Sequence, residues 1–270
     1  FFKKNKIIKK ILLKTNKSFG PKNLDIIIKS LVNYKNNINK IGIATTGIVK
    51  NGKWSVLNKK TIGNFYNFPL IKYIKKRINK PVFVLGDTHS AALGELKFGI
   101  GKKFSNFFYI TISTGVGGSM VINKKIFNEK EALAGAFGHM VIKKGGYLCG
   151  CGRKGCIEAY SSGNAIQKII KKLKKNISTE EMFNSYRHTK WSKKIINNAA
   201  NIIAEGIVNV NSLTGIKNFV VGGSIGLSND FFDRIKKNIK EISSQKILIV
   251  KAALKNDAEV YGCLARSKQN

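Results

Sequence analysis

The sequence predicts an α/β fold, because short apolar segments alternate with amphipathic segments along the 270-residue chain. Apolar runs with strand character occur at 40–49, 81–87, 106–123, 219–225 and 246–253, and the run at 106–123 is interrupted by a glycine turn. Segments with helical periodicity occur at 21–35, 70–78, 89–99, 163–176, 191–214 and 229–242. Strands that alternate with helices in this way predict sheets covered by helices.

The elements predicted in the first 100 residues follow from local sequence features, taken here in chain order. Residues 1–15 predict two short strands or a hairpin, and 21–35 predict a helix that begins at Pro21 and spaces its apolar positions by three and four. Residues 40–49 form a buried strand that enters a turn at Gly47. LIKYIKKRI is amphipathic, PVFVLGD is an apolar strand, and the helix after it ends at Gly99.

The composition is that of a globular protein, with 43% hydrophobic residues and a formal net charge of +35. Lysine is dispersed through all segments and accompanied by abundant Asn and Ile, as an AT-rich genome would produce. We therefore expect solvated surfaces with a salt-dependent affinity for polyanions such as ATP, and no nucleic-acid partner. No run has the length of a membrane span and no signal peptide is visible, so a cytoplasmic protein without a membrane partner is expected.

One histidine and three cysteines lie within eighteen residues, in a segment rich in glycine. Their residue types and spacing predict a structural zinc site, because a Cys₃His set fills all four positions of tetrahedral Zn²⁺. The alternative is a set of unrelated reduced thiols. Cys263 lies far away and is expected to be a small core residue. The expected ligands are His139, Cys149, Cys151 and Cys156.

Three further segments have the residues of a ligand site. Asp87 follows an apolar strand, where a carboxylate would face a ligand crevice or would cap the next helix. The segment 113–118 joins two strands by a glycine-rich turn that can cradle phosphate or can be a simple hairpin. The segment 221–224 has paired glycines between a strand and a helix, which would let a flat purine or its ribose approach the backbone.

The order of these motifs resembles the ROK family, which contains bacterial sugar kinases and related repressors. The resemblance rests on IGIATTGIV, VLGDTHSAA, ITISTGVGG, GHM…CGCGRKGCIEAYSSG, VVGGSIGL and DAEVYGCL. It implies the actin-like (ribonuclease H-like) two-domain ATPase and sugar kinase fold. The expected lobes are 1–104, completed by a C-terminal helix at 256–270, and 105–255, which contains the zinc segment 139–156.

The implied reaction is ATP-dependent phosphorylation of a sugar. Within the family, IATTGIVKNG, NFPLIKYI and VVGGSIGL favour the 6-hydroxyl of N-acetylmannosamine, an amino sugar of sialic acid degradation. The alternatives are a glucokinase-like hexose kinase, a ROK repressor that needs a preceding helix-turn-helix, and a non-catalytic sugar-binding remnant. ATP with Mg²⁺ and structural Zn²⁺ are the implied cofactors, and family members usually form homodimers.

The resemblance also implies residue roles. Asp87 becomes the catalytic base, and His139 combines zinc binding with a hydrogen bond to the sugar. Glu158 accepts hydrogen bonds from the sugar, and Gly47 and Thr61 occupy positions near it. The residues assigned to ATP are Thr114, Gly115, Val116, Gly117 and Gly118 at the phosphates, and Gly222 and Gly223 at the adenosine.

The sequence departs from the family pattern at three places. The chain starts at Phe1 without an initiator Met, so the N-terminal strand and the Asp-x-Gly-Gly-Thr motif that helps to position Mg²⁺ in relatives are expected to be missing from this chain. Gly86 stands where relatives carry Asn before the base, and Ala136 where many carry a polar residue. We therefore expect weakened activity or a shifted sugar preference.

Overall fold

The computed structural model describes residues 1–13, 22–56, 65–129, 131 and 133–269. The strands in these ranges are β1 (Phe2–Lys3), β2 (Lys6–Ile7), β3 (Ile41–Thr45), β4 (Ile48–Lys50), β5 (Lys53–Ser55), β6 (Val82–Gly86), β7 (Phe107–Ile112), β8 (Val116–Ile122), β9 (Lys125–Ile126), β10 (Asn218–Gly222) and β11 (Leu248–Lys251). The α-helices are α1 (Lys22–Val32), α3 (Leu70–Ile78), α4 (Asp87–Phe98), α5 (Glu158–Ser161), α6 (Gly163–Lys172), α7 (Thr179–Ser185), α8 (Lys190–Thr214), α9 (Asn229–Ile242) and α10 (Ala258–Ser267).

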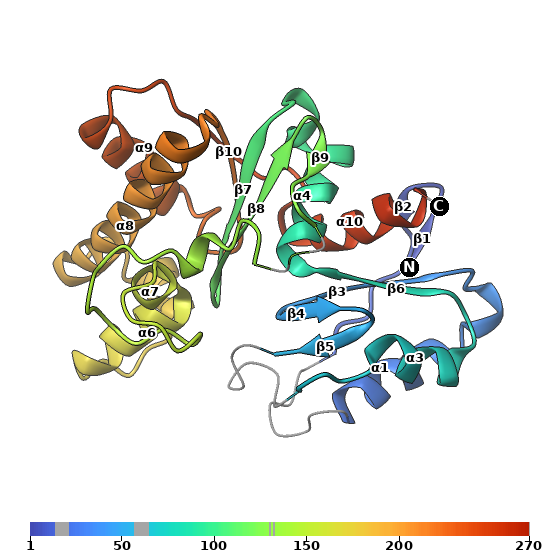
Figure 1. The fold of residues 1–270 in the computed structure, drawn as a ribbon. Coiled ribbons are helices and arrows are strands. Elements are labelled where there is room, and N and C mark those ends of the chain that lie inside the picture. The colour runs from blue at the N-terminus through green and yellow to red at the C-terminus, as the bar shows by residue number, and fades with distance from the viewer. Residues whose placement is uncertain (14–21, 57–64, 130, 132, 270) are drawn as a thin grey trace.

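The main sheet has five strands in the order β11-β10-β7-β8-β9 (Figure 1). Strand β10 runs parallel to both β11 and β7, whereas β8 is antiparallel to β7. Alternate residues of β7 enter two different cores: Phe108, Ile110 and Ile112 face one, and Phe107 and Tyr109 face the other. Both faces are thus buried, which explains the continuous apolar run in the sequence.

Helices cover both faces of this sheet. Helices α6, α8 and α9 contribute to the larger core on one face, and α4 and α10 contribute to the core on the other (Figure 1). Helices α4 and α10 cross closely, because a Cβ at Gly262 would lie 1.7 Å from the carbonyl oxygen of Ser90 and one at Gly94 would lie 2.2 Å from that of Ala258. Small residues at this crossing therefore hold the C-terminal helix against α4.

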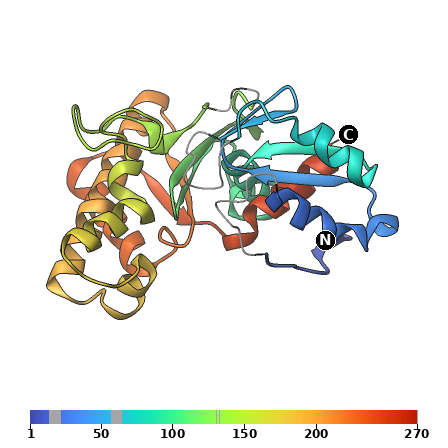
Figure 2. The same ribbon diagram turned by 90° about the horizontal axis from the view of Figure 1, so that it is seen from below.

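The N-terminal part forms a separate core from α1, α3, β3, β5 and β6. Strands β3 and β6 are parallel, with Thr45 opposite Gly86 at their carboxyl ends. Helix α10 packs against β3 as well as α4, and Figure 2 shows this C-terminal helix beside the N-terminal segments. This packing supports our proposal that the C-terminal helix completes a lobe formed by residues 1–104, with a second lobe at 105–255.

Most predicted elements are present, with shifted ends. The hairpin at the N-terminus is β1 and β2, and the helices predicted at 70–78 and 229–242 are α3 and α9 with those bounds. The helix predicted at 163–176 ends at Lys172, and the helix predicted from residue 89 begins at Asp87. Helix α7 was not predicted. No described helix combines the length and apolar character that a membrane crossing requires.

Candidate active site and metal centre

Asp87 lies at the carboxyl end of the parallel pair β3 and β6. Gly86 is the N-cap of α4 in extended conformation, and Asp87 is the first helical residue. The expectation that Asp87 could serve as the N-cap is therefore wrong, because the helix starts two residues earlier than the sequence indicated. One carboxylate oxygen, Oδ1, accepts a hydrogen bond of 2.7 Å from the backbone N–H of Thr88.

The surroundings of Asp87 favour its protonated form. Burial raises the pKa of Asp87 above its usual range, and the negative charge of Glu158 adds to the increase, although the Thr88 N–H and His89 act in the opposite direction. A carboxylate whose pKa is raised is a stronger base than an exposed one.

The start of α4 contacts strand β8 through a glycine. A Cβ at Gly117 would lie 2.5 Å from Cγ2 of Thr88, so only glycine permits the observed approach. Val116, Gly117 and Gly118 lie within β8, paired with Ile112, Thr111 and Ile110, and the turn comprises 113–115. The turn is therefore shorter than the predicted segment 113–118, because the last two glycines serve close packing in the strand. The assignment of Val116, Gly117 and Gly118 to the ATP phosphates stays a prediction.

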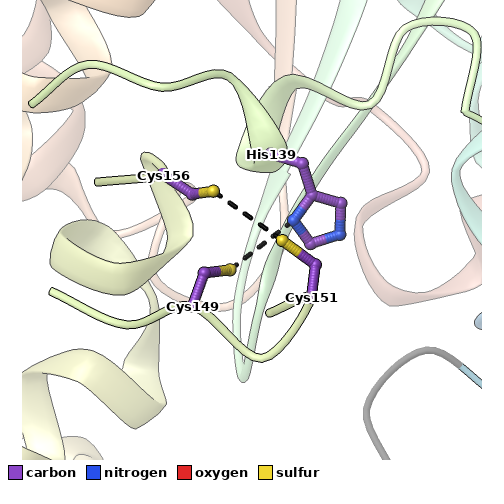
Figure 3. A group of neighbouring side chains, drawn as sticks. All are labelled: His139, Cys149, Cys151 and Cys156. Atoms are coloured by element: carbon purple, nitrogen blue, oxygen red, sulfur yellow. Dashed lines mark hydrogen bonds between the residues drawn. The ribbon is translucent and has the colours of Figure 1, made fainter. Parts of the chain in front are cut away.

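The four predicted metal ligands lie together, as Figure 3 shows. Their ligand atoms all lie within 4.8 Å of one another, with Cys151 Sγ 3.8 Å from Cys156 Sγ and Cys149 Sγ 3.7 Å from Nδ1 of His139. Two thiolates bound to tetrahedral Zn²⁺ at about 2.3 Å lie roughly 3.8 Å apart. The donor types and the spacing therefore fit a tetrahedral metal ion.

The backbone holds this segment in a tight loop. Isolated bridges pair Val141 with Cys156 and Leu148 with Lys154, and the N–H of Cys149 donates to the carbonyl of Arg153 at 2.8 Å. Burial raises the pKa of Cys149 to about 12, so this sulfur carries a proton unless a cation replaces it. His139 turns Nδ1 to the thiols, which leaves Nε2 on the opposite side of the ring.

Glu158 connects the segment 139–156, called the metal loop below, to the turn after β7. It is the first residue of α5, and its Oε2 accepts a 3.0 Å hydrogen bond from the N–H of Val116. Its other oxygen, Oε1, lies 3.9 Å from Sγ of Cys149. A Cβ at Gly115 would lie 2.7 Å from Oε2, so the glycine makes room for this carboxylate. Glu158 is thus held between the turn and the metal loop, and is not a freely solvated surface charge.

A cavity of about 940 Å³ opens beside the same turn. The carboxyl ends of the parallel strands β7 and β10 meet there, and Oγ of Ser113 lies 3.2 Å from Oγ of Ser224. Ligands of α/β sheets collect at such strand ends. The cavity is lined by Ser113, Thr114, Gly163, Asn164, Gln167, Ser178, Thr179, Glu180, Phe183, Asn184, Arg187, Ser224, Ile225, Leu227, Ser228, Asn229 and Asp230.

Of the residues assigned to ATP from the sequence, Thr114 lines this cavity. Gly222 ends β10, and Gly223 follows it with φ of +82° immediately before the lining residue Ser224. The lining residues of α6 and α7 were missed. The Ser178–Glu181 capping box is the sequence signal that could have revealed α7.

Gly47 and Thr61 are the other two residues that the sequence predicts near the sugar. Gly47 lies two residues beyond the end of β3 and has φ of +93°, and a Cβ there would lie 2.4 Å from the carbonyl oxygen of Ser55. It therefore forms the turn between β3 and β4, close to the strand end that precedes Asp87. Thr61 lies outside the described residues.

Comparisons with known proteins agree with this arrangement. A profile of the ROK family matches residues 6–270. The N-acetylmannosamine kinase of Haemophilus influenzae is 33% identical over 217 residues, which cover 80% of this chain and 72% of that protein. A ROK hexokinase from Thermus thermophilus has a TM-score of 0.79 at 21% identity, covering 94% of this chain and 88% of that chain. A ROK glucokinase from Streptomyces griseus, solved with glucose and AMPPNP, has a TM-score of 0.78 at 25% identity, covering 90% of this chain and 87% of that chain.

These likenesses establish the fold as the actin-like, ribonuclease H-like fold of ROK sugar kinases. The family profile extends over nearly the whole chain and includes all four candidate metal ligands. The protein therefore belongs to the ROK family.

Proposed function

We propose that this protein is an ATP-dependent sugar kinase that transfers the γ-phosphoryl group of ATP to the 6-hydroxyl of N-acetylmannosamine. The observation that carries the proposal is the position of Asp87, a half-buried carboxylate at a parallel strand end whose pKa is raised by burial and, to a smaller extent, by the charge of Glu158. The 33% identity to an N-acetylmannosamine kinase supports this choice of sugar.

In this mechanism Asp87 acts as the general base. As the sugar O6 forms its bond to the γ-phosphorus, the proton of the 6-hydroxyl passes to the Asp87 carboxylate, and the bond from that phosphorus to the bridging oxygen of ADP breaks. The products are the sugar 6-phosphate and ADP, and Asp87 then releases the proton to solvent. Mg²⁺ bound with ATP would neutralise charge on the phosphate oxygens.

The metal centre supplies orientation in this proposal. His139, Cys149, Cys151 and Cys156 would hold Zn²⁺ in a closed site, which leaves no coordination position for a reacting water. Binding through Nδ1 would fix the His139 ring so that Nε2 can hydrogen-bond a sugar hydroxyl. Glu158, whose carboxylate is held by the Val116 N–H, would accept hydrogen bonds from the sugar beside it.

The cavity beside the turn 113–115 is the proposed nucleotide site. Hydroxyl and amide side chains dominate the polar part of its lining, which also contains one cation, Arg187, and two carboxylates, Glu180 and Asp230. Its volume of about 940 Å³ is within the range of pockets that bind cofactors. The proposed ATP and sugar sites share the segment 113–117, which joins the cavity to the start of α4.

A substrate panel tests the function directly. The protein is incubated with Mg²⁺-ATP and N-acetylmannosamine, N-acetylglucosamine, glucose or mannose, and ³¹P NMR identifies the phosphorylated position while a coupled assay measures ADP. We expect the highest kcat/KM with N-acetylmannosamine and phosphate at the 6-position. A preference for glucose would favour a hexose kinase, as the likeness to a glucokinase suggests, and absence of phosphorylation with every sugar would reject the kinase proposal.

A further inference from the structure

A short segment of the chain runs directly from the metal loop to the proposed nucleotide cavity. It begins at the candidate ligand Cys156, passes through α5 and reaches the first turn of α6, where Gly163 and Asn164 line the cavity. We call residues 156–164 the connecting segment. The turn 113–115 contributes two further lining residues to the same cavity. The connecting segment therefore belongs to both the candidate metal centre and the proposed nucleotide site.

The cavity end of the connecting segment holds one side of the turn through backbone hydrogen bonds. The N–H of Gly163 donates to the carbonyl oxygen of Ser113 at 2.8 Å, and the N–H of Asn164 donates to that of Thr114 at 3.2 Å. Oγ of the buried Ser161 donates to a carbonyl oxygen of α8 at 2.9 Å, which fixes this end against the core. None of these bonds involves a residue of the metal loop, so they hold their side of the turn independently of a metal ion.

The other side of the turn is held by Glu158, which lies two residues beyond Cys156. Its Oε2 accepts the 3.0 Å hydrogen bond from the N–H of Val116, and a Cβ at Gly115 would lie 2.7 Å from the same oxygen. Its Oε1 lies 3.9 Å from Sγ of the candidate ligand Cys149. The contact of Glu158 with the turn thus depends on where the metal loop places the start of α5.

We propose that Glu158 is a positioning residue through which an occupied metal centre holds the turn 113–115 in its nucleotide-binding position. This inference rests on the proposed function, in which the cavity beside the turn binds ATP. With Cys149 and Cys156 bound to one ion, the start of α5 is fixed and Glu158 keeps its hydrogen bond to Val116. Without the ion the metal loop is released, this hydrogen bond weakens, and nucleotide binds less tightly. Metal loading and nucleotide affinity are therefore coupled.

Two substitutions of Glu158 separate its hydrogen bond from a general effect of its charge. Glu158→Gln retains a side-chain oxygen that can accept from the Val116 N–H, whereas Glu158→Ala leaves that N–H without its side-chain partner. Coupling should therefore persist in Glu158→Gln and disappear in Glu158→Ala. Glu205→Ala is the matched control, because Glu205 is also half-buried and accepts a 2.9 Å hydrogen bond, from Asn201, but does not line the cavity.

The experiment measures the dissociation constant of Mg²⁺-AMPPNP by calorimetry without sugar, so the role proposed for Glu158 in sugar binding does not enter. Each protein is compared with zinc bound and after removal of zinc, with elemental analysis for the metal content and circular dichroism to confirm folding. In the wild type, Glu158→Gln and Glu205→Ala, removal of zinc should weaken nucleotide binding at least about fivefold. Zinc-loaded Glu158→Ala should bind nucleotide as weakly as the zinc-free wild type, and removal of its zinc should change the affinity less than about twofold.

Equal nucleotide affinity of the zinc-loaded and the folded zinc-free wild type would overturn the coupling. A zinc-loaded Glu158→Ala that binds nucleotide like the wild type would overturn it too, and this comparison decides alone if the zinc-free protein unfolds. In both cases nucleotide still binds, so the proposed function stands. A wild type that takes up no zinc would also overturn the coupling, whereas a zinc-loaded wild type that does not bind Mg²⁺-AMPPNP would reject the proposed function and this inference together.

Discussion

At the scale of single residues, the protonation of Asp87 is determined by what surrounds its carboxyl group. Burial raises its pKa, and repulsion from Glu158 acts in the same direction. The base must be ionised to accept a proton, so kcat/KM should fall as the pH decreases through this raised pKa. The midpoint should lie above the ordinary aspartate value of about 3.9. Measurement of kcat/KM between pH 4 and 9, with circular dichroism to confirm folding, checks this expectation, and a midpoint at or below 3.9 contradicts it.

Glu259 gives a second prediction, on stability. Burial and the nearby charge of Asp87 raise the pKa of Glu259 to about 7. Between its ordinary value of about 4.3 and this value the folded state binds more protons than the unfolded state, so stability is lost as the pH rises through that interval. Glu259→Gln should therefore raise the free energy of unfolding at pH 8 by on the order of 1 kcal/mol and change it little near pH 4.5.

Urea unfolding at pH 4.5 and 8 measures this difference. Glu241→Gln is the matched control, because the Glu241 side chain is 58% exposed and lies on α9, away from Asp87. A destabilised Glu259→Gln at pH 8 would show that the carboxylate is ionised and favourably bound in the folded state, contrary to our expectation.

At the scale of elements, the contact between α4 and β8 positions Asp87, the proposed base. Gly117→Ala would bring a Cβ within 2.5 Å of Thr88 Cγ2, so the Thr88 side chain or the start of α4 must move. Because small displacements of a catalytic group are costly, we expect kcat to fall at least about tenfold. Thr88→Ser removes Cγ2, so the double variant Gly117→Ala/Thr88→Ser should recover most of the lost kcat. Steady-state kinetics of the three variants provide the test, and failure of the second substitution to rescue would argue against this contact.

Local sequence patterns predicted the elements well where packing follows periodicity. Helices α3 and α9 have the predicted bounds because their apolar residues recur at helical spacing between clear ends. The cluster of candidate metal ligands was also predictable, since all four residues lie in one short segment. Strand β8 was placed correctly, but its glycines were assigned to a turn, because their function is to admit Thr88 and Phe137 from distant segments.

Long-range geometry limited what the sequence could reveal about the site. The hydrogen bond from Val116 N–H to Glu158 joins residues 42 apart, and no local pattern indicates it. The orientation of His89 likewise depends on Ala134, 45 residues away. The resemblance to the ROK family supplied the proposed role of Asp87, whereas the contacts of Glu158 and His89 required the folded chain.

At the scale of the whole molecule, the metal loop joins the main core. Phe137 and Ile157, which flank the loop, are fully buried in the larger core under α8. Loss of the metal ion from these residues should therefore loosen packing beyond the loop, because the free energy of metal binding contributes to the free energy of folding. We expect about one Zn²⁺ per chain, and chelation or Cys156→Ser should lower Tm by several degrees.

Elemental analysis and thermal unfolding measure these quantities. Cys263→Ser is the matched control, because Cys263 is also buried but lies on α10 beside Ser90. This control should retain the metal. A protein that binds no zinc, or whose Tm is unaffected by chelation, would show that the cluster does not act as a structural metal site.

The central claim is that Asp87 accepts the proton of the sugar hydroxyl during phosphoryl transfer. Asp87→Asn keeps the shape of the side chain but removes the base, so the most direct measurement is kcat with saturating Mg²⁺-ATP and N-acetylmannosamine. We predict a loss of at least about a hundredfold, with sugar affinity measured by calorimetry changed far less. An Asp87→Asn variant that retains the wild-type kcat would contradict the account.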